Sequence, residues 1–182
     1  MIQTIHLGHL LRETVASPYR NLVTRPTGAA IRNRIRERLA ASDCLTALLD
    51  FSGIELLDFS CADEVVAKLL LAAEEHGGRF VVLGGLREDQ GEAIEHVLTH
   101  HRLAVAAVAF GDEHEAPRLL GWVTADARAA FECVGARGSV TAGELAQVLG
   151  WPASRGAAAL EALARRRLVQ TGEGRYQPLP IA

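Results

Sequence analysis

The apolar positions in the first two thirds of the chain follow two repeats, one typical of buried strands and one typical of amphipathic helices. Nearly unbroken apolar runs of strand length predict strands buried on both faces, and these runs cover residues 44–51, 80–83 and 103–110. Apolar residues at helical spacing predict helices between them, and these segments cover residues 28–41, 63–76 and 89–101. Two shorter runs, 4–10 and 21–24, predict a pair of strands at the start. This alternation predicts an α/β fold, a sheet flanked by helices.

The last third of the chain changes to helices rich in Ala and Arg, followed by a strand–turn–strand pattern. The predicted helices cover residues 124–135, 141–149 and 153–167. Thr141 followed three residues later by Glu144 is typical of a capping box. Residues 168–178 contain Gly-Glu-Gly between two short strand patterns and predict a hairpin. Three helices and a hairpin are the layout of a winged helix-turn-helix domain.

The boundary between the two predicted domains falls in a polar, acidic stretch, residues 111–117. We therefore predict domains at 1–118 and 119–182. The whole chain has a formal net charge of -3, too close to neutral to indicate nucleic-acid binding. Residues 124–182 nevertheless carry seven Arg against five acidic side chains, which suits a C-terminal domain that meets an anionic partner.

Cysteine content and hydropathy indicate a reducing compartment. The three cysteines, Cys44, Cys61 and Cys133, form no CxxC pair and indicate neither a disulfide framework nor a structural metal site. No apolar run reaches the length of a membrane span, and the N-terminus lacks a signal-peptide pattern. The sequence predicts a cytoplasmic protein with no membrane contact and no cofactor.

A motif spanning residues 48–85 resembles the core of STAS domains, and the STAS-like family of unknown function most of all. The matching residues are Leu49-Asp50-Phe51, Gly53-Ile54, Phe59 and Asp63-Glu64, with Thr24-Arg25 upstream. The resemblance implies a STAS-like regulatory domain. In anti-sigma-factor antagonists of the STAS type, a Ser that opens a helix is phosphorylated by a partner kinase, and the phosphate releases the partner.

Ser60 matches that phosphoacceptor position, although Cys61 replaces the Gly that follows it in the antagonists and Phe59 replaces a small residue. The resemblance implies a partner-binding surface formed by Asp58, Phe59, Ser60, Cys61, Asp63 and Glu64. Its expected partner is a kinase-like ATPase or an anti-sigma factor. A phosphate at a helix N-terminus would gain from the helix dipole and would add charge to a surface that the partner must cover. A purely structural alternative stays open, in which Ser60 and Asp63 form a capping box.

The C-terminal domain is similar to bacterial winged helices, a module that DNA-binding and protein-binding regulators share. If it binds DNA, the third helix enters the major groove, where Ser154 and Arg155 could contact base edges. Arg165, Arg166 and Arg175 would contact phosphates. The alternative is a docking or packing module with solvated arginines, and outward Ala158, Ala159 and Ala162 favour it.

Two further groups of residues could form chemical sites. His96, His100 and His101 lie within about one helical turn and could hold a divalent metal, but no strong motif accompanies them. Asp58, Asp63 and Glu64 could serve acid–base chemistry, although acidic residues in a first helical turn are ordinary dipole partners.

The sequence thus predicts a regulator without enzymatic activity. Its STAS-like protein-interaction switch would be coupled to a DNA-binding winged helix that serves transcription regulation. The alternative is an adaptor of the anti-sigma-factor-antagonist type without DNA binding. A homodimer is compatible with either.

Overall fold

The computed structural model describes residues 1–15, 20–73, 77–111 and 116–181 of the 182-residue chain. It divides into two compact units, one formed by residues 1–122 with Ile181 and the other by residues 123–180. Within the described residues, none of the helices combines the length and the apolar character that crossing a bilayer requires.

The first unit is built on a five-stranded sheet in the order β1-β3-β5-β6-β7. Its strands are β1 (Ile2–His6), β3 (Thr46–Asp50), β5 (Phe80–Gly84), β6 (Ala104–Val108) and β7 (Arg118–Gly121). The first four are parallel, and β7 closes the edge in antiparallel register with β6. Because each parallel strand is added on the same side of the previous one, right-handed crossovers place the connecting helices on one face.

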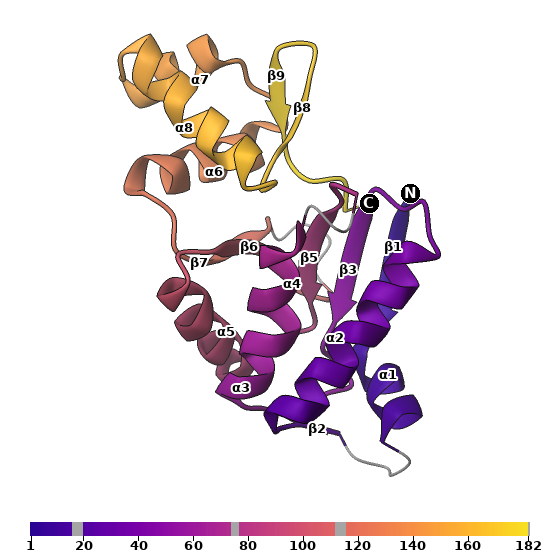
Figure 1. Ribbon diagram of the computed structural model, residues 1–182. Coiled ribbons are helices and arrows are strands. Elements are labelled where there is room, and N and C mark those ends of the chain that lie inside the picture. The colour runs from indigo at the N-terminus through magenta and orange to yellow at the C-terminus, as the bar shows by residue number, and fades with distance from the viewer. Residues whose placement is uncertain (16–19, 74–76, 112–115, 182) are drawn as a thin grey trace. The chain divides into compact units, whose positions relative to one another are not determined.

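Those helices cover that face and form the core with it (Figure 1). They are α1 (Leu7–Thr14), α2 (Arg25–Ala40), α5 (Glu88–His100) and a continuous helical segment, residues 59–71, made of α3 (Phe59–Ala62), η1 (Asp63–Ala67) and α4 (Lys68–Leu71). The middle segment, η1, is π-helical. A second, two-residue parallel pairing joins β2 (Asn21–Leu22) to β4 (Leu56–Leu57).

The structure corrects the predicted start of the chain. Residues 4–10 do not form a strand paired with residues 21–24, because β1 ends at His6 and α1 begins directly after it. β1 pairs with β3, and β2 pairs with β4. The helix predicted over 63–76 begins at Phe59; its predicted end, residues 74–76, lies outside the described residues.

The division between the units also differs from the predicted one. Part of the predicted boundary, residues 112–115, lies outside the described residues. β7 follows this stretch and pairs with β6 through four residue pairs, so it completes the first sheet. The division therefore moves from 118/119 to 122/123.

Gly28 lets α2 approach the helical segment 59–71 at backbone distance. A Cβ at Gly28 would lie 2.9 Å from the Glu64 Cβ and 3.1 Å from the Cys61 Cα. We expect Gly28→Ala to destabilise the first unit by about 1–3 kcal/mol through overpacking, although Ala is the better helix former. Gly135→Ala is the control: it lies in a helix with nothing within 4 Å of the added methyl and should stabilise by about 0.5–1 kcal/mol. Urea unfolding of both variants measures the two signs, and a stabilised Gly28→Ala would contradict the close packing.

The second unit contains three helices and a hairpin, and its elements are α6 (Ala125–Arg137), α7 (Ala142–Leu149), α8 (Ala153–Arg165), β8 (Gln170–Gly172) and β9 (Arg175–Gln177). The predicted capping box at Thr141 and Glu144 is present, with both reciprocal hydrogen bonds. The hairpin turns through Glu173 and Gly174, both at positive φ, as a two-residue type I′ turn requires. An isolated bridge from Val140 to Tyr176 joins the hairpin to the segment before α7.

Candidate functional site

The junction between β4 and α3 is organised by the carboxylate of Asp58. Asp58 is the N-cap of α3, and its Oδ1 accepts hydrogen bonds from the Cys61 backbone N–H and the Ser60 hydroxyl, both at 2.8 Å. Its Oδ2 accepts the backbone N–H of Thr24 at 3.0 Å. One side chain therefore fixes both the first turn of the helix and the entry to α2.

Thr24, at the start of α2, has an unusual backbone conformation. Its φ is 71°, a region that β-branched residues rarely occupy. Its N–H is held by Asp58, and its carbonyl accepts the Cys61 thiol at 3.0 Å. Strain of this kind persists where surrounding bonds hold it, and such places are often functional.

Below this junction, two carboxylates of η1 are paired with arginine and lysine side chains and with His101. Arg25 Nη1 donates to Asp63 Oδ2 at 2.8 Å and to Glu64 Oε1 at 2.7 Å. Arg32 and Lys68 also pair with Glu64, whose side chain is only 3% exposed. His101 Nε2 lies 2.7 Å from Asp63 Oδ1. This network locks α2, η1 and α5 together behind the exposed first turn of α3.

The carboxylates of the junction have lowered pKa values. Burial alone would raise the pKa of Asp58, but the N–H groups of Cys61 and Thr24 outweigh it and hold the pKa below its ordinary 3.8. Burial likewise acts against the ionised form of Asp63, yet Arg25 and His101 keep its pKa below the ordinary value. The carboxylates are thus stabilised as anions and are poorly suited to act as general acids near neutral pH.

These shifts predict acid destabilisation of the first unit. A carboxyl whose pKa is lower in the folded state contributes stability above its unfolded pKa and loses it as the pH falls through the folded value. We therefore expect the free energy of unfolding to fall steeply only below about pH 4. Asp58→Asn should reduce the dependence of the unfolding free energy on pH below about pH 4, because the Asn side chain does not titrate. Urea unfolding at several pH values measures the effect, and an unchanged slope would contradict the assigned role of Asp58.

Cys61 is a structural thiol. Its side chain is fully buried, and burial together with the nearby Asp58 raises its pKa to about 12. A thiol in this state is a poor nucleophile and a poor metal ligand.

The exposed side of the junction carries an apolar patch beside a hollow. Phe59 is 59% exposed and Leu56 is 53% exposed, the two large apolar side chains that β4 and α3 present to solvent. The ring of Phe59 lies against that of His96, with 4.9 Å between centroids. The adjoining hollow has a volume of about 600 Å³. Its lining includes Arg25, Phe59, Ser60, Asp63, His96, His100 and His101. We call it the histidine hollow.

The structure separates the sequence-predicted partner-binding residues into two groups. Phe59 is exposed, and Asp58, Ser60 and Asp63 are half-buried around it. Cys61 and Glu64 are buried, so these two side chains support the surface from behind rather than form it. The capping box proposed for Ser60 and Asp63 is wrong: Asp58 caps the helix, and Ser60 lies in its first turn.

Sequence reasoning missed the cations of this site. Arg25 belongs to the matched Thr24-Arg25 pair but has no predicted role, and Arg32 is in none of the predicted sites. The available signal was Glu64 in the matched Asp63-Glu64 motif, because a Glu at an inward-facing helical position requires a cation close by.

Two of the four predicted DNA-contacting arginines of the second unit pair with acidic side chains. Arg155 makes a bidentate pair with Asp126 at 2.7 and 2.8 Å and lies over the Trp151 ring. Arg175 pairs with Glu144 at 2.8 Å. Ser154 and Arg165 are exposed and Arg166 is half-buried, whereas Ala159, expected to face outward, is buried.

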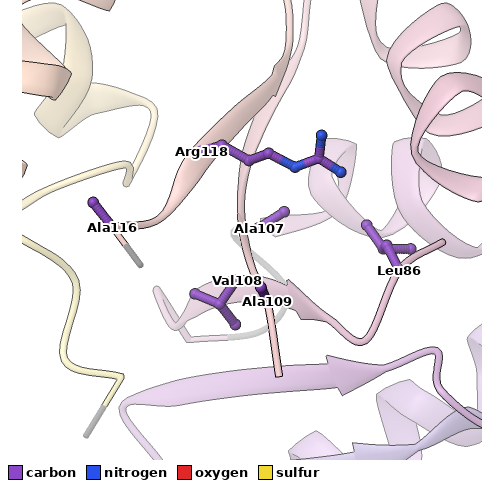
Figure 2. A pocket seen from close by; sticks show the side chains of 6 residues that line it. All are labelled: Leu86, Ala107, Val108, Ala109, Ala116 and Arg118. Carbon is purple, nitrogen blue, oxygen red and sulfur yellow. The ribbon is translucent and has the colours of Figure 1, made fainter. Parts of the chain in front are cut away.

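Two other features of the first unit are an ion pair and a small apolar hollow. His6 Nδ1 lies 2.6 Å from the buried Asp50 Oδ2 at the carboxyl ends of β1 and β3. A hollow of about 190 Å³ at the end of β6 is lined mainly by Ala, Val and Leu side chains. Figure 2 shows Arg118 beside it, extending on the side of Leu86 and away from Ala116. Among the residues that the structure describes, no group of three or more His, Cys, Asp or Glu side chains is arranged to hold a metal ion.

Comparison with known proteins assigns neither a family nor a function to this chain. No protein-family model matches the sequence, and no curated protein or solved structure matches it significantly.

Proposed function

We propose that this chain is a regulatory protein without enzymatic activity whose first unit, a STAS-like domain, binds a partner protein through the β4–α3 junction. The observation that carries the proposal is the exposure of Phe59 and Leu56 on a junction that hydrogen bonds and ion pairs hold rigid. Large aromatic side chains on a preorganised surface are typical hot spots of protein interfaces. The resemblance to anti-sigma-factor antagonists supports the same surface and suggests a kinase-like ATPase or an anti-sigma factor as the partner.

Phosphorylation of Ser60 is the proposed switch. Its half-buried hydroxyl donates to Asp58 at 2.8 Å. A phosphate at this position would abolish that bond and would place about two negative charges beside the carboxylates of Asp58 and Asp63. The first turn of α3 would have to rearrange around Arg25, and the surface that a partner covers would change in charge and shape.

The docking proposal is tested by crosslinking followed by affinity measurement. A photoreactive phenylalanine analogue at position 59 should crosslink one specific protein in cells, whereas the same analogue at position 45 should not. Leu45 is the matched control because it is 47% exposed, at the amino end of β3. With the purified partner, Phe59→Asp should weaken binding by about 30-fold or more, and Leu45→Asp should not change it. Equal crosslinking at both positions, or an affinity that Phe59→Asp leaves intact, rules out the junction.

The switch has its own test. With the same partner, Ser60→Asp should reproduce the loss of binding, and Ser60→Ala should retain it. If Ser60→Asp binds as tightly as the unmodified protein, phosphorylation does not control this surface.

For the second unit we propose a winged helix that docks protein, within a protein-interaction adaptor. Arg155, which is exposed, pairs with Asp126, and the half-buried Arg175 pairs with Glu144. The exposed face of α8 carries Ala158, and the turn of the hairpin carries Glu173. Each of these features lowers the positive potential that a DNA backbone would meet.

DNA binding is the second candidate, and the three-helix and hairpin arrangement with exposed Ser154 and Arg165 favours it. Exposed ion pairs are weak enough for DNA to displace. In that case binding to promoter fragments should fall steeply with salt, and Arg155→Ala combined with Arg165→Ala should weaken it. Binding that is absent at low salt, or that the double variant leaves unchanged, excludes this candidate.

A further inference from the structure

We propose that residues 20–24 form a releasable segment, which the hydrogen bond from the Thr24 N–H to Asp58 keeps closed and which phosphorylation of Ser60 opens. The inference rests on the proposed switch and specifies how that switch acts. The docking surface would lose the support of β2 as well as gain charge. Some contacts hold this segment closed, and two features of the segment itself oppose the closed position.

The backbone of Thr24 opposes the closed position. Its φ of 71° and ψ of 138° lie in a region that β-branched residues rarely adopt, and such a conformation persists only where surrounding contacts impose it. Its carbonyl oxygen stays with the helices, because it accepts the Gly28 N–H at 3.1 Å and the Cys61 thiol at 3.0 Å. Thr24 can therefore relax only if the chain before it moves.

Asn21 in β2 also opposes the closed position. Its side-chain oxygen, Oδ1, is buried and has no hydrogen-bond partner among the described residues. A buried polar atom without a partner destabilises the state that buries it, because the atom loses its hydrogen bonds to water. Movement of β2 away from β4 would return water to this oxygen.

Three kinds of contact hold the segment closed. The side chain of Leu22 is fully buried in the core. The Glu55 N–H donates to the Arg20 carbonyl at 2.7 Å. The Asp58 N–H donates to the Leu22 carbonyl at 3.2 Å. The third contact is the bond from the Thr24 N–H to the Asp58 carboxylate at 3.0 Å, and a bond to an ionised acceptor is stronger than one to a neutral acceptor.

Asp58 is also the contact through which Ser60 can act on this segment. Its Oδ2 accepts the Thr24 N–H, and its Oδ1 accepts the Ser60 hydroxyl at 2.8 Å. Ser60 lines the histidine hollow, so it can be reached from solvent. Phosphorylation joins the Ser60 oxygen to the γ-phosphorus of a nucleoside triphosphate, breaks the bond to the diphosphate and releases the hydroxyl proton.

The phosphate would displace the Asp58 carboxylate. Asp58 loses the hydroxyl that donated to Oδ1 and faces about two added negative charges in its place. Because both oxygens belong to one planar group, a displacement of Oδ1 also moves Oδ2 away from the Thr24 N–H. Loss of that bond leaves the strain of Thr24 and the buried oxygen of Asn21 opposed by fewer contacts, so the population of the open form rises.

Opening of the segment would remove the support of Leu56, one of the two exposed apolar side chains of the docking surface. The N–H groups of Glu55 and Asp58 flank Leu56 and lose their acceptors in the open form. Ile54 stays attached to α5, because the Gln90 side chain donates to its carbonyl oxygen at 2.8 Å. Opening therefore alters β4 and leaves its attachment to α5 intact.

Hydrogen exchange followed by NMR on the full chain, without any partner, tests this balance. The reporters are the N–H groups of Glu55 and Asp58. Phosphoserine incorporated at position 60 should speed their exchange by about tenfold, whereas phosphoserine at position 154, an exposed Ser in the second unit, should not. Thr24→Gly should slow the exchange by about threefold or more, because glycine adopts positive φ without strain. Thr24→Gly should also offset the effect of phosphoserine at position 60.

Asp58→Asn is a second way to open the segment. Asn keeps an oxygen for the helix cap but replaces the acceptor that faces Thr24 by an amide donor, so it should speed the exchange as phosphoserine does. Faster exchange in Thr24→Gly would overturn the inference, because Thr24 would then not be strained. Exchange that Asp58→Asn leaves unchanged would overturn the role of the bond, and exchange that phosphoserine leaves unchanged would overturn the link to Ser60.

These results separate the releasable segment from the docking proposal. If exchange changes as expected but no partner requires Phe59, the docking proposal fails and the segment stands. If phosphoserine at position 60 releases a partner without changing the exchange of Glu55 and Asp58, the docking proposal stands and the segment inference fails, because the added charge alone would account for release.

Discussion

Replacing Glu64 with alanine should lower the free energy of unfolding of the first unit by about 3 kcal/mol or more. The side chain is 3% exposed and is the common partner of Arg25, Arg32 and Lys68. Its removal leaves Arg32, which is only 20% exposed, without the carboxylate that compensates its burial. Removing one member of a buried ion pair is costly for this reason, even where the intact pair stabilises little.

Urea unfolding measures this effect in a chain whose Trp151 is replaced by Phe, so that Trp122 reports on the first unit. Glu37→Ala is the matched control, because Glu37 pairs with Arg34 on the exposed side of α2. The control should change the free energy of unfolding by less than about 0.5 kcal/mol. If both variants lower the free energy of unfolding by the same small amount, the network around Glu64 stabilises the fold no more than an exposed ion pair does.

Gly121→Ala should destabilise the same unit by about 3–4 kcal/mol, because two independent penalties coincide at this residue. Its φ of 99° is a conformation that L side chains rarely adopt. An added Cβ would also collide with the carbonyl oxygen of Leu103 and would lie 2.8 Å from the Leu98 Cβ. Because β7 packs against α5 at this point, neither backbone can move apart without breaking the pairing of β7 with β6.

Gly138→Ala separates the two penalties. Gly138 also has positive φ, 74°, but nothing lies within 4 Å of an added Cβ. It should therefore cost only about 1–2 kcal/mol, from backbone strain alone. The measurement is urea unfolding of the second unit, reported by Trp151 after replacement of Trp122 by Phe. Equal losses of unfolding free energy in the two variants would show that the structure around Gly121 accommodates the added methyl group without an energetic cost.

The sequence predicted the elements that carry continuous local signals. The central strands β3, β5 and β6 match the nearly unbroken apolar runs to within a few residues, and the capping box of α7 was evident from two residues. The mixed α/β class and the three-helix and hairpin arrangement of the second unit followed from those signals.

What the sequence did not predict depends on contacts between distant residues. The two-residue strands β2 and β4 have no periodicity of their own, and their pairing brings Leu22 to Leu57. The second bond of the Asp58 carboxylate, to the N–H of Thr24, joins residues 34 positions apart. The role of Arg25 is likewise visible only once α2 lies against η1. Each of these features depends on a contact between residues far apart in the sequence, and local sequence patterns contain no signal for such a contact.

The π-helical segment η1 governs how this chain should be aligned with others. A wider turn of this kind holds an additional residue, so residues 59–62 and 68–71 are rotated relative to each other by about 100° compared with an uninterrupted α-helix. A relative with a regular helix here matches both the Asp58 cap and the buried Leu69 only if a one-residue gap is opened within 63–67. An ungapped motif drawn across residues 57–71 would match one half of this helix and miss the other.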